Sequence, residues 1–155
     1  MGYDIDFVTS STEEASISEE VIDELPPLDL TPTQRACWQR IVHRIQAEIG
    51  SAQTSAYTNH LELWLEQPAI QVWYAGDVVT VEMPYWYTDS QLQAITAIRV
   101  LYSLAGIVQE ETGMEAHDPQ IGVTVNIDHA ERAARAYCGT GQTVLTVESR
   151  TDDSR

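Results

Sequence analysis

Apolar and polar residues alternate along three consecutive stretches in the middle of the chain, within residues 60–86. A period of two is typical of strands that bury one face. Short breaks at Gln67-Pro68 and Gly76-Asp77 separate the stretches, and both contain residues that favour tight turns. We therefore predict three antiparallel strands joined by two turns. An even register would pair, on the buried face, Leu63 with Val72, Val72 with Val81, and Ile70 with Met83.

Two longer segments repeat their apolar residues with the helical period and are predicted to cover this sheet. The first helix is expected over 32–49, with Thr31 as its N-cap. The second is expected over 89–112, opened by a capping box in which Thr88 and Gln91 satisfy each other's amides.

Shorter patterns predict the remaining elements. Strands are expected over 3–8, 123–127 and 143–147, and a short helix over 129–137. The segment 51–59 has no clear period and is interpreted as a loop. Together these elements predict an α+β fold. It is a two-layer sandwich, in which an antiparallel sheet of about four or five strands has two main helices packed on one face.

The chain is interpreted as one domain over 1–137, followed by an extension over 138–155 that is expected to be partly disordered. An acidic segment over 9–30 is expected to be partly flexible. The N-terminus lacks the basic start and apolar run of a secretory signal. No continuous apolar run approaches the ~20 residues that cross a bilayer. A cytoplasmic location away from membranes is the resulting expectation.

The charge balance narrows the classes of partner. The chain has 8 basic and 24 acidic residues, a net charge of −16, and all its basic residues are arginines. Such a charge repels nucleic acid and favours a basic protein partner. Two interpretations of the acidic segment stay open, a docking arm for a basic surface or a solvated linker. The candidate docking residues in this segment are Glu19, Glu20, Asp23 and Glu24.

No sequence motif indicates catalysis. The chain has no glycine-rich phosphate loop, no Gly-x-Ser-x-Gly elbow and no His-Glu-x-x-His pair, and its four histidines are scattered. Cys37 and Cys138 lie far apart and are expected to be reduced thiols without a role. We therefore predict no catalytic residue, no cofactor and no metal site, and we expect that the chain is not an enzyme.

The polar face of the predicted meander is unusual because it combines large aromatic rings with carboxylates. Rigid aromatic side chains beside carboxylates are typical of protein interfaces. The alternative is that 51–59 or the C-terminal segment folds over this face. We expect Trp64 to be covered in this way and Trp73 to be exposed as an anchor. The candidate partner-binding residues on this face are Trp64, Trp73, Trp86, Glu62 and Glu82.

Two short signatures suggest a family. The chain begins Met1-Gly2-Tyr3-Asp4, and after the second predicted helix it reads Gly113-Met114-Glu115-Ala116-His117-Asp118-Pro119-Gln120-Ile121-Gly122. This pattern resembles a loose group of small bacterial cytoplasmic proteins that begin Met-Ser-Tyr-Asp and end a helix with Gly-x-x-x-Tyr-Asp-Pro-Gln-x-Gly. Several of those proteins are taken to be immunity proteins encoded beside polymorphic or contact-dependent toxins. Gly2 replaces the serine of the pattern, and His117 replaces its tyrosine.

The resemblance implies a protein that binds and neutralises a toxin domain. Two other hypotheses stay open, a small-ligand-binding domain or enzyme that uses His117 and Asp118, and a homodimer whose tryptophan face is its own interface. Asp118, Pro119 and Gln120 are interpreted as a structural turn, because an aspartate can hydrogen-bond the backbone two residues on and proline fixes φ. Alanine at His117 or Asp118 is expected to change stability at most modestly.

Overall fold

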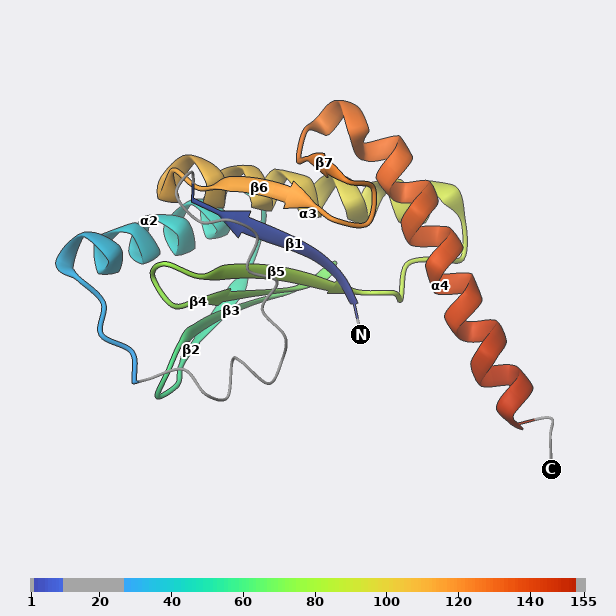
Figure 1. The fold of residues 1–155 in the computed structure, drawn as a ribbon, viewed down its shortest axis with the longest axis horizontal. Coiled ribbons are helices and arrows are strands. Elements are labelled where there is room, and N and C mark those ends of the chain that lie inside the picture. The colour runs from blue at the N-terminus through green and yellow to red at the C-terminus, as the bar shows by residue number, and fades with distance from the viewer. Residues whose placement is uncertain (1, 10–26, 153–155) are drawn as a thin grey trace.

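A seven-stranded antiparallel sheet forms the centre of the computed structural model, which describes residues 2–9 and 27–152, and the side chains of 2–9 and 27–141. The strands lie in the order β2-β3-β4-β5-β1-β6-β7, so that the N-terminal strand is central (Figure 1). The strands are β1 (Gly2–Val8), β2 (Ala52–Ala56), β3 (Leu61–Glu66), β4 (Ala69–Tyr74), β5 (Val79–Pro84), β6 (Glu115–Asp118) and β7 (Val123–Thr124).

The register of the central meander confirms the sequence pattern. Val72 pairs with Leu63 on one side and with Val81 on the other. The described pairing of β4 with β5 begins at Gln71, one residue after the predicted partner of Met83. Gly76 has a φ of 84°, a left-handed conformation that glycine adopts without steric cost, at the predicted second turn.

The first two helices form where the sequence places them, although the second begins differently. Helix α2 (Pro32–Glu48) begins with the predicted Thr31 cap, which shares a capping box with Gln34. Helix α3 (Gln91–Thr112) begins at Ser90, whose hydroxyl accepts a hydrogen bond from the Gln93 amide at 3.0 Å. The predicted Thr88 cap is wrong. Thr88 is instead buried, with its methyl group against the position where Gly141 would carry a Cβ atom.

The C-terminal part of the chain differs most from the prediction. A short 3₁₀ helix η1 (Ile127–His129) leads into one helix, α4 (Ala130–Asp152), which continues without a break past residue 137. The predicted strand over 143–147 is therefore wrong, because the preceding helix continues through residues whose own propensity favours a strand. The last part of α4 extends away from the body of the molecule (Figure 1).

Two short or polar strands, β2 and β6, were not predicted from the sequence, and a third, β7, is shorter than predicted. The segment interpreted as a loop contains β2, an edge strand whose polar, mostly exposed residues carry no alternation. Strand β6 has four residues and was not predicted, and β7 covers only Val123–Thr124 of the expected 123–127. The α+β class is therefore confirmed, while the sheet has seven strands rather than four or five, and α4 adds a third long helix.

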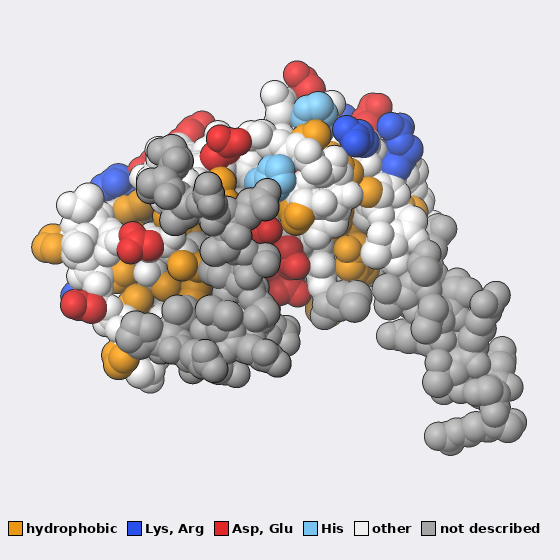
Figure 2. All heavy atoms as spheres, in the orientation of Figure 1, with side chains coloured by type: hydrophobic (Ala, Val, Ile, Leu, Met, Phe, Trp, Pro, Cys, Tyr) orange, Lys and Arg blue, Asp and Glu red, His pale blue; other side chains and the backbone are white. Residues whose placement is uncertain are grey.

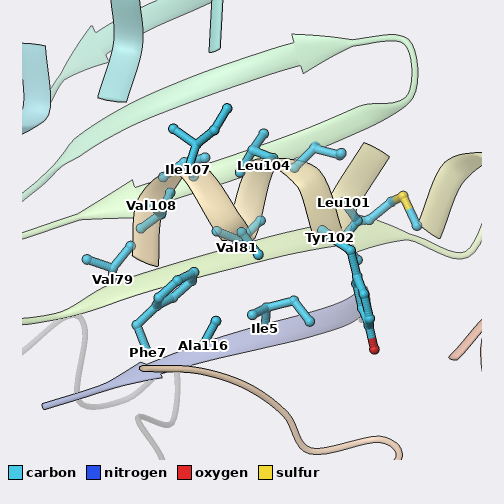
Figure 3. Packing of buried hydrophobic residues seen from close by; sticks show 14 of the residues in the cluster. Ile5, Phe7, Val79, Val81, Leu101, Tyr102, Leu104, Ile107, Val108 and Ala116 are labelled. Carbon is cyan, nitrogen blue, oxygen red and sulfur yellow. The ribbon is translucent and has the colours of Figure 1, made fainter. Parts of the chain in front are cut away.

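One hydrophobic core lies between the sheet and its helices. Alternate residues of β1, Tyr3, Ile5 and Phe7, point into this core together with those of β5, and α3 supplies the facing side chains (Figure 3). Helix α2 packs beside α3, and α4 packs against the other side of α3. The opposite face of the sheet carries the polar half of each strand, and this face positions the candidate site.

Helix α3 is also long and apolar enough to cross a membrane by length and composition alone. Half of its apolar window is buried inside the protein, where it covers the sheet. Burial of this kind is typical of the core helix of a globular domain.

Candidate functional site

The polar face of the sheet, here called the open face, consists of two rows of side chains that cross neighbouring strands. Strand pairing places the members of each row side by side, at the usual strand spacing of about 5 Å. The first row is Gln53, Trp64, Gln71, Glu82 and Asp4. The second row is Ser55, Glu62, Trp73, Thr80, Asp6, His117 and Thr124.

The centre of the open face is acidic. Asp4 on β1 lies directly opposite Glu82 on β5, and the Glu82 side chain lies over Gly2, where a Cβ atom would come within 2.5 Å of its Oε1 atom. Acidic side chains gather over the middle of the sheet in the view of Figure 2, close to a histidine. Neighbouring like charges raise the negative potential that a cationic group would meet here.

Asp6, which lies in the second row of the open face, has a perturbed carboxyl group. Burial raises the pKa of the Asp6 carboxyl, and the charge of Asp118 raises it further, while His117 on the adjacent strand lowers it. Burial also raises the pKa of the Tyr85 hydroxyl, with added contributions from Asp4, Asp118 and Glu82. The open face therefore holds negative charge at a cost in folding free energy.

At the other end of the two rows, aromatic rings surround a histidine. The His60 ring is stacked between Tyr57 and Trp73, with ring centroids 4.8 Å away on each side. Its Nε2 atom lies 2.9 Å from Glu62 Oε1, and the indole Nε1 of Trp64 donates to Glu62 Oε2 at 2.9 Å. Glu62 is only 8% exposed, so both of its oxygens are held by neighbours inside the protein.

The three tryptophans differ in exposure from the sequence expectation. Trp73 is 7% exposed because His60 stacks on it, whereas Trp64 is 44% exposed, so the expectation that Trp73 was the exposed ring and Trp64 the covered one is wrong. Trp86 is 69% exposed but follows the end of β5, beside Tyr87 and outside the two rows. Trp64 is therefore the large aromatic surface that the open face offers.

Asp118 lies at the end of β6 and is fully buried. Its Oδ2 atom accepts hydrogen bonds from the hydroxyls of Tyr3, at 2.7 Å, and Tyr102. Burial, and then the bond to this carboxyl, raise the pKa of both hydroxyls well above the ordinary tyrosine value, which keeps them protonated as donors. Asp118 thus links β1 and α3 to β6. Because its carboxyl is buried and accepts two hydrogen bonds, we now expect Asp118→Ala to cost more stability than the modest change that the sequence suggested.

The turn after β6 has the local hydrogen bond that the sequence suggested. Asp118 Oδ1 accepts from the Gln120 amide at 3.1 Å, and the exposed Pro119 stands between them. With its amide oriented to satisfy its neighbours, the Gln120 side chain bridges Asp118 and the backbone of Asp4. This turn therefore braces β1, the strand that carries Asp4 at the acidic centre of the open face.

The structure adds little about the remaining candidate residues. Glu19, Glu20, Asp23 and Glu24 lie outside the described residues. Within the part of the chain that the structure describes, no three His, Cys, Asp or Glu side chains are grouped in a way that could hold a metal ion. The Cys37 thiol donates to the Glu111 carbonyl at 3.3 Å, and the Cys138 thiol donates to the Thr88 carbonyl at 3.6 Å.

Sequence reasoning missed Asp4, Asp6 and His60 as members of the open face. The alternation in 3–8 does put both aspartates on the polar side of a strand, but it gives no information about which strand lies next to β1. His60 had no signal, since its stacking partners come from two different strand ends. Comparisons with protein-family models, curated proteins and solved structures found no match.

Proposed function

We propose that this chain is an immunity-type protein that uses the open face to bind and neutralise a basic toxin domain. The observation that carries the proposal is the pairing of Asp4 with Glu82 in the middle of the sheet, in the same row of side chains as the exposed ring of Trp64. Two carboxylates on facing positions strengthen the local negative potential, which favours a partner that brings a cationic side chain to this face.

The chemistry of the face supports a protein partner rather than a small ligand. Its two rows cross the neighbouring strands β2, β3, β4, β5 and β1, which makes it a broad surface. A large, rigid aromatic side chain next to carboxylates is typical of the residues that dominate binding energy in protein interfaces. The net charge of −16 favours encounter with a basic partner and is unfavourable for nucleic acid.

The two alternative hypotheses have less support. A ligand site at His117 and Asp118 would need an available carboxylate, but the Asp118 carboxyl is fully buried and bonded to two tyrosines. A homodimer through the open face would bring the carboxylates of two copies together, which opposes association unless cations intervene. We keep the dimer as one outcome of the test below.

The test begins with the product of the gene next to that of this chain, purified as a candidate toxin and mixed with the wild-type protein. The association and dissociation rates are then compared for wild type, Glu82→Gln and Trp64→Ala. Glu131→Gln is the matched control, since it removes the same charge from an exposed position on α4, outside the two rows.

We expect Glu82→Gln to slow association, with a loss that shrinks as salt rises, because steering acts on the encounter rate. We expect Trp64→Ala to speed dissociation by about 30-fold, the equivalent of a hot spot of about 2 kcal/mol. Glu131→Gln should change neither rate. If Glu82→Gln and Trp64→Ala both match the wild type, the contact lies elsewhere, and sedimentation that finds a dimer instead would replace the proposal with the homodimer.

The same experiment tests the acidic segment. Neutralising Glu19, Glu20, Asp23 and Glu24 together should slow association without changing dissociation if this segment steers the partner. An unchanged association rate would leave these four residues as a device for solubility.

A further inference from the structure

His60, Glu62 and Trp64 form a chain of contacts, and this chain indicates which kind of partner side chain the open face binds. Glu62 has two carboxylate oxygens and a different partner on each, His60 Nε2 at 2.9 Å and Trp64 Nε1 at 2.9 Å. A charge-assisted bond of this kind is stronger than one between neutral groups. Glu62 is buried, which strengthens both bonds because little water reaches the carboxylate.

His60 is itself fixed from every side. Tyr57 stacks on one side of its ring with an interplanar angle of 7°, and Trp73 stacks on the other side with an angle of 24°. Its Nδ1 atom lies 2.5 Å from Asn59 Oδ1. With the imidazole clamped in this way, the carboxylate of Glu62 is held in one position, and so is the indole that it binds.

Because of this arrangement, the exposed part of the Trp64 ring has no polar group of its own. The only polar group of the indole, its N–H, is already bonded to Glu62 inside the protein. The part of the ring that faces solvent is therefore hydrocarbon and π surface alone. A partner that covers it removes no hydrogen bond, and little side-chain freedom is lost because the ring is already fixed.

We propose that Trp64 is a preformed platform for an arginine side chain of the basic partner, and that Glu62 and His60 are the residues that position it. The inference rests on the proposed function for the identity of the partner. A guanidinium is planar and stacks on an indole face, the strongest aromatic acceptor of a cation. Gln71 lies next to Trp64 on β4, and Glu82 follows on β5, about 10 Å from Trp64 at ordinary strand spacing.

The positioning part is tested on this chain alone by NMR of the indole N–H groups. The chain has 4 tryptophans, and comparison with Trp64→Phe assigns the Trp64 signal. Glu62→Leu removes the acceptor and should shift that signal and speed its exchange with water, whereas Glu62→Gln keeps an acceptor and should preserve most of it. His60→Phe retains stacking but removes the bond to Glu62, and should give an intermediate effect. A Trp64 signal that is the same in all three variants would overturn the positioning role.

The arginine part is tested with a small probe. N-acetyl-arginine amide is titrated into the wild-type protein, with the citrulline analogue as an uncharged control of nearly the same shape. We expect the arginine probe to move the Trp64 signal, less at high salt, and the citrulline probe to move it much less. In Glu62→Leu the response to arginine should fall.

The outcomes separate this inference from the proposed function. If neither probe moves the Trp64 signal, or if both move it equally, the platform is not selective for a cation and the inference fails. The proposed function would still stand if Trp64→Ala and Glu82→Gln weaken binding of the protein partner. If instead the arginine probe binds as expected and no basic protein does, the platform stands and the immunity-type function fails.

Discussion

Asp4 and Glu82 lie directly opposite each other on the two central strands β1 and β5, and both side chains are only partly buried. Like charges in this position destabilise a sheet, and most sheets pair such a residue with an opposite charge or a neutral one. The centre of the open face is therefore a place where folding stability is lower than it could be.

Neutralising this pair should stabilise the free protein. We expect Glu82→Gln to raise the free energy of unfolding by about 0.2–1 kcal/mol, the usual size of a cross-strand charge effect. Denaturant unfolding at low salt measures the gain, which should shrink at 1 M salt because the Debye length falls to about 3 Å. Glu131→Gln serves as a contrast and should lower stability slightly, because Glu131 lies in the first turn of α4, where a negative charge is favourable. A loss of stability in Glu82→Gln would mean that the carboxylate makes a favourable contact in the free protein.

Asp6 should make stability depend on pH. Its pKa is raised in the folded protein, first by burial and then by Asp118, so the folded state binds this proton more tightly than the unfolded state does. Stability from this residue is therefore lost as pH rises from the ordinary aspartate value of about 3.9 through the raised pKa. We expect Asp6→Asn to be more stable than the wild type at neutral pH and to lose that advantage in acid. Unfolding curves across this range measure it, and an advantage independent of pH would contradict the assignment.

Removing the Asp118 carboxyl should be strongly destabilising. Asp118→Ala leaves the buried hydroxyls of Tyr3 and Tyr102 without their acceptor, and each unsatisfied group costs about 1–3 kcal/mol. We expect a total loss of about 3 kcal/mol or more in the free energy of unfolding. Asp118→Asn keeps one carbonyl acceptor and should lose less. His117→Ala, on the half-exposed open face, should lose least, and equal losses at 117 and 118 would show that the tyrosine contacts carry little energy.

Val72 tests the register of the meander. It is fully buried between Leu63 and Val81, so Val72→Asp places an unpaired charge in the core. Substitutions of this kind cost several kcal/mol, and we expect about 4 kcal/mol or loss of folding. Thr54→Asp, at an exposed position of the edge strand β2, is the control and should change little. An unchanged melting temperature in Val72→Asp would contradict the pairing described here.

The elements that could be predicted are those whose signal is local. Thr31 caps α2, and alternation defines β1, β3, β4 and β5 within the chain itself. The capping position of α3 was predicted two residues early, because Thr88 and Ser90 are both good caps and only packing against Gly141 decides between them. Polar β2 and four-residue β6 take their strand conformation from the neighbour that they pair with, which no local pattern records.

Only the part of the site that depends on local alternation could be predicted. Sequence alternation correctly put Glu62, Trp64 and Glu82 on the polar face of the sheet. The exposure of the tryptophans depends on His60, because its ring stacks on Trp73 and covers it. His60 lies immediately before β3, the strand that pairs with the Trp73 strand β4. Exposure on a sheet face is set by contacts of this kind between neighbouring strands, and they became visible only with the fold.

The central place of β1 has a consequence for the chain as it is being made. Its neighbours β5 and β6 come from 79–84 and 115–118, so β1 leaves the ribosome long before either partner exists. At ~5–20 residues per second the strand waits several seconds with Tyr3, Ile5 and Phe7 unburied. During that wait Asp4 and Asp6, which alternate with these apolar residues, act as gatekeepers that discourage pairing between nascent chains. The carboxylates that weaken the finished sheet would thus protect its first strand from aggregation.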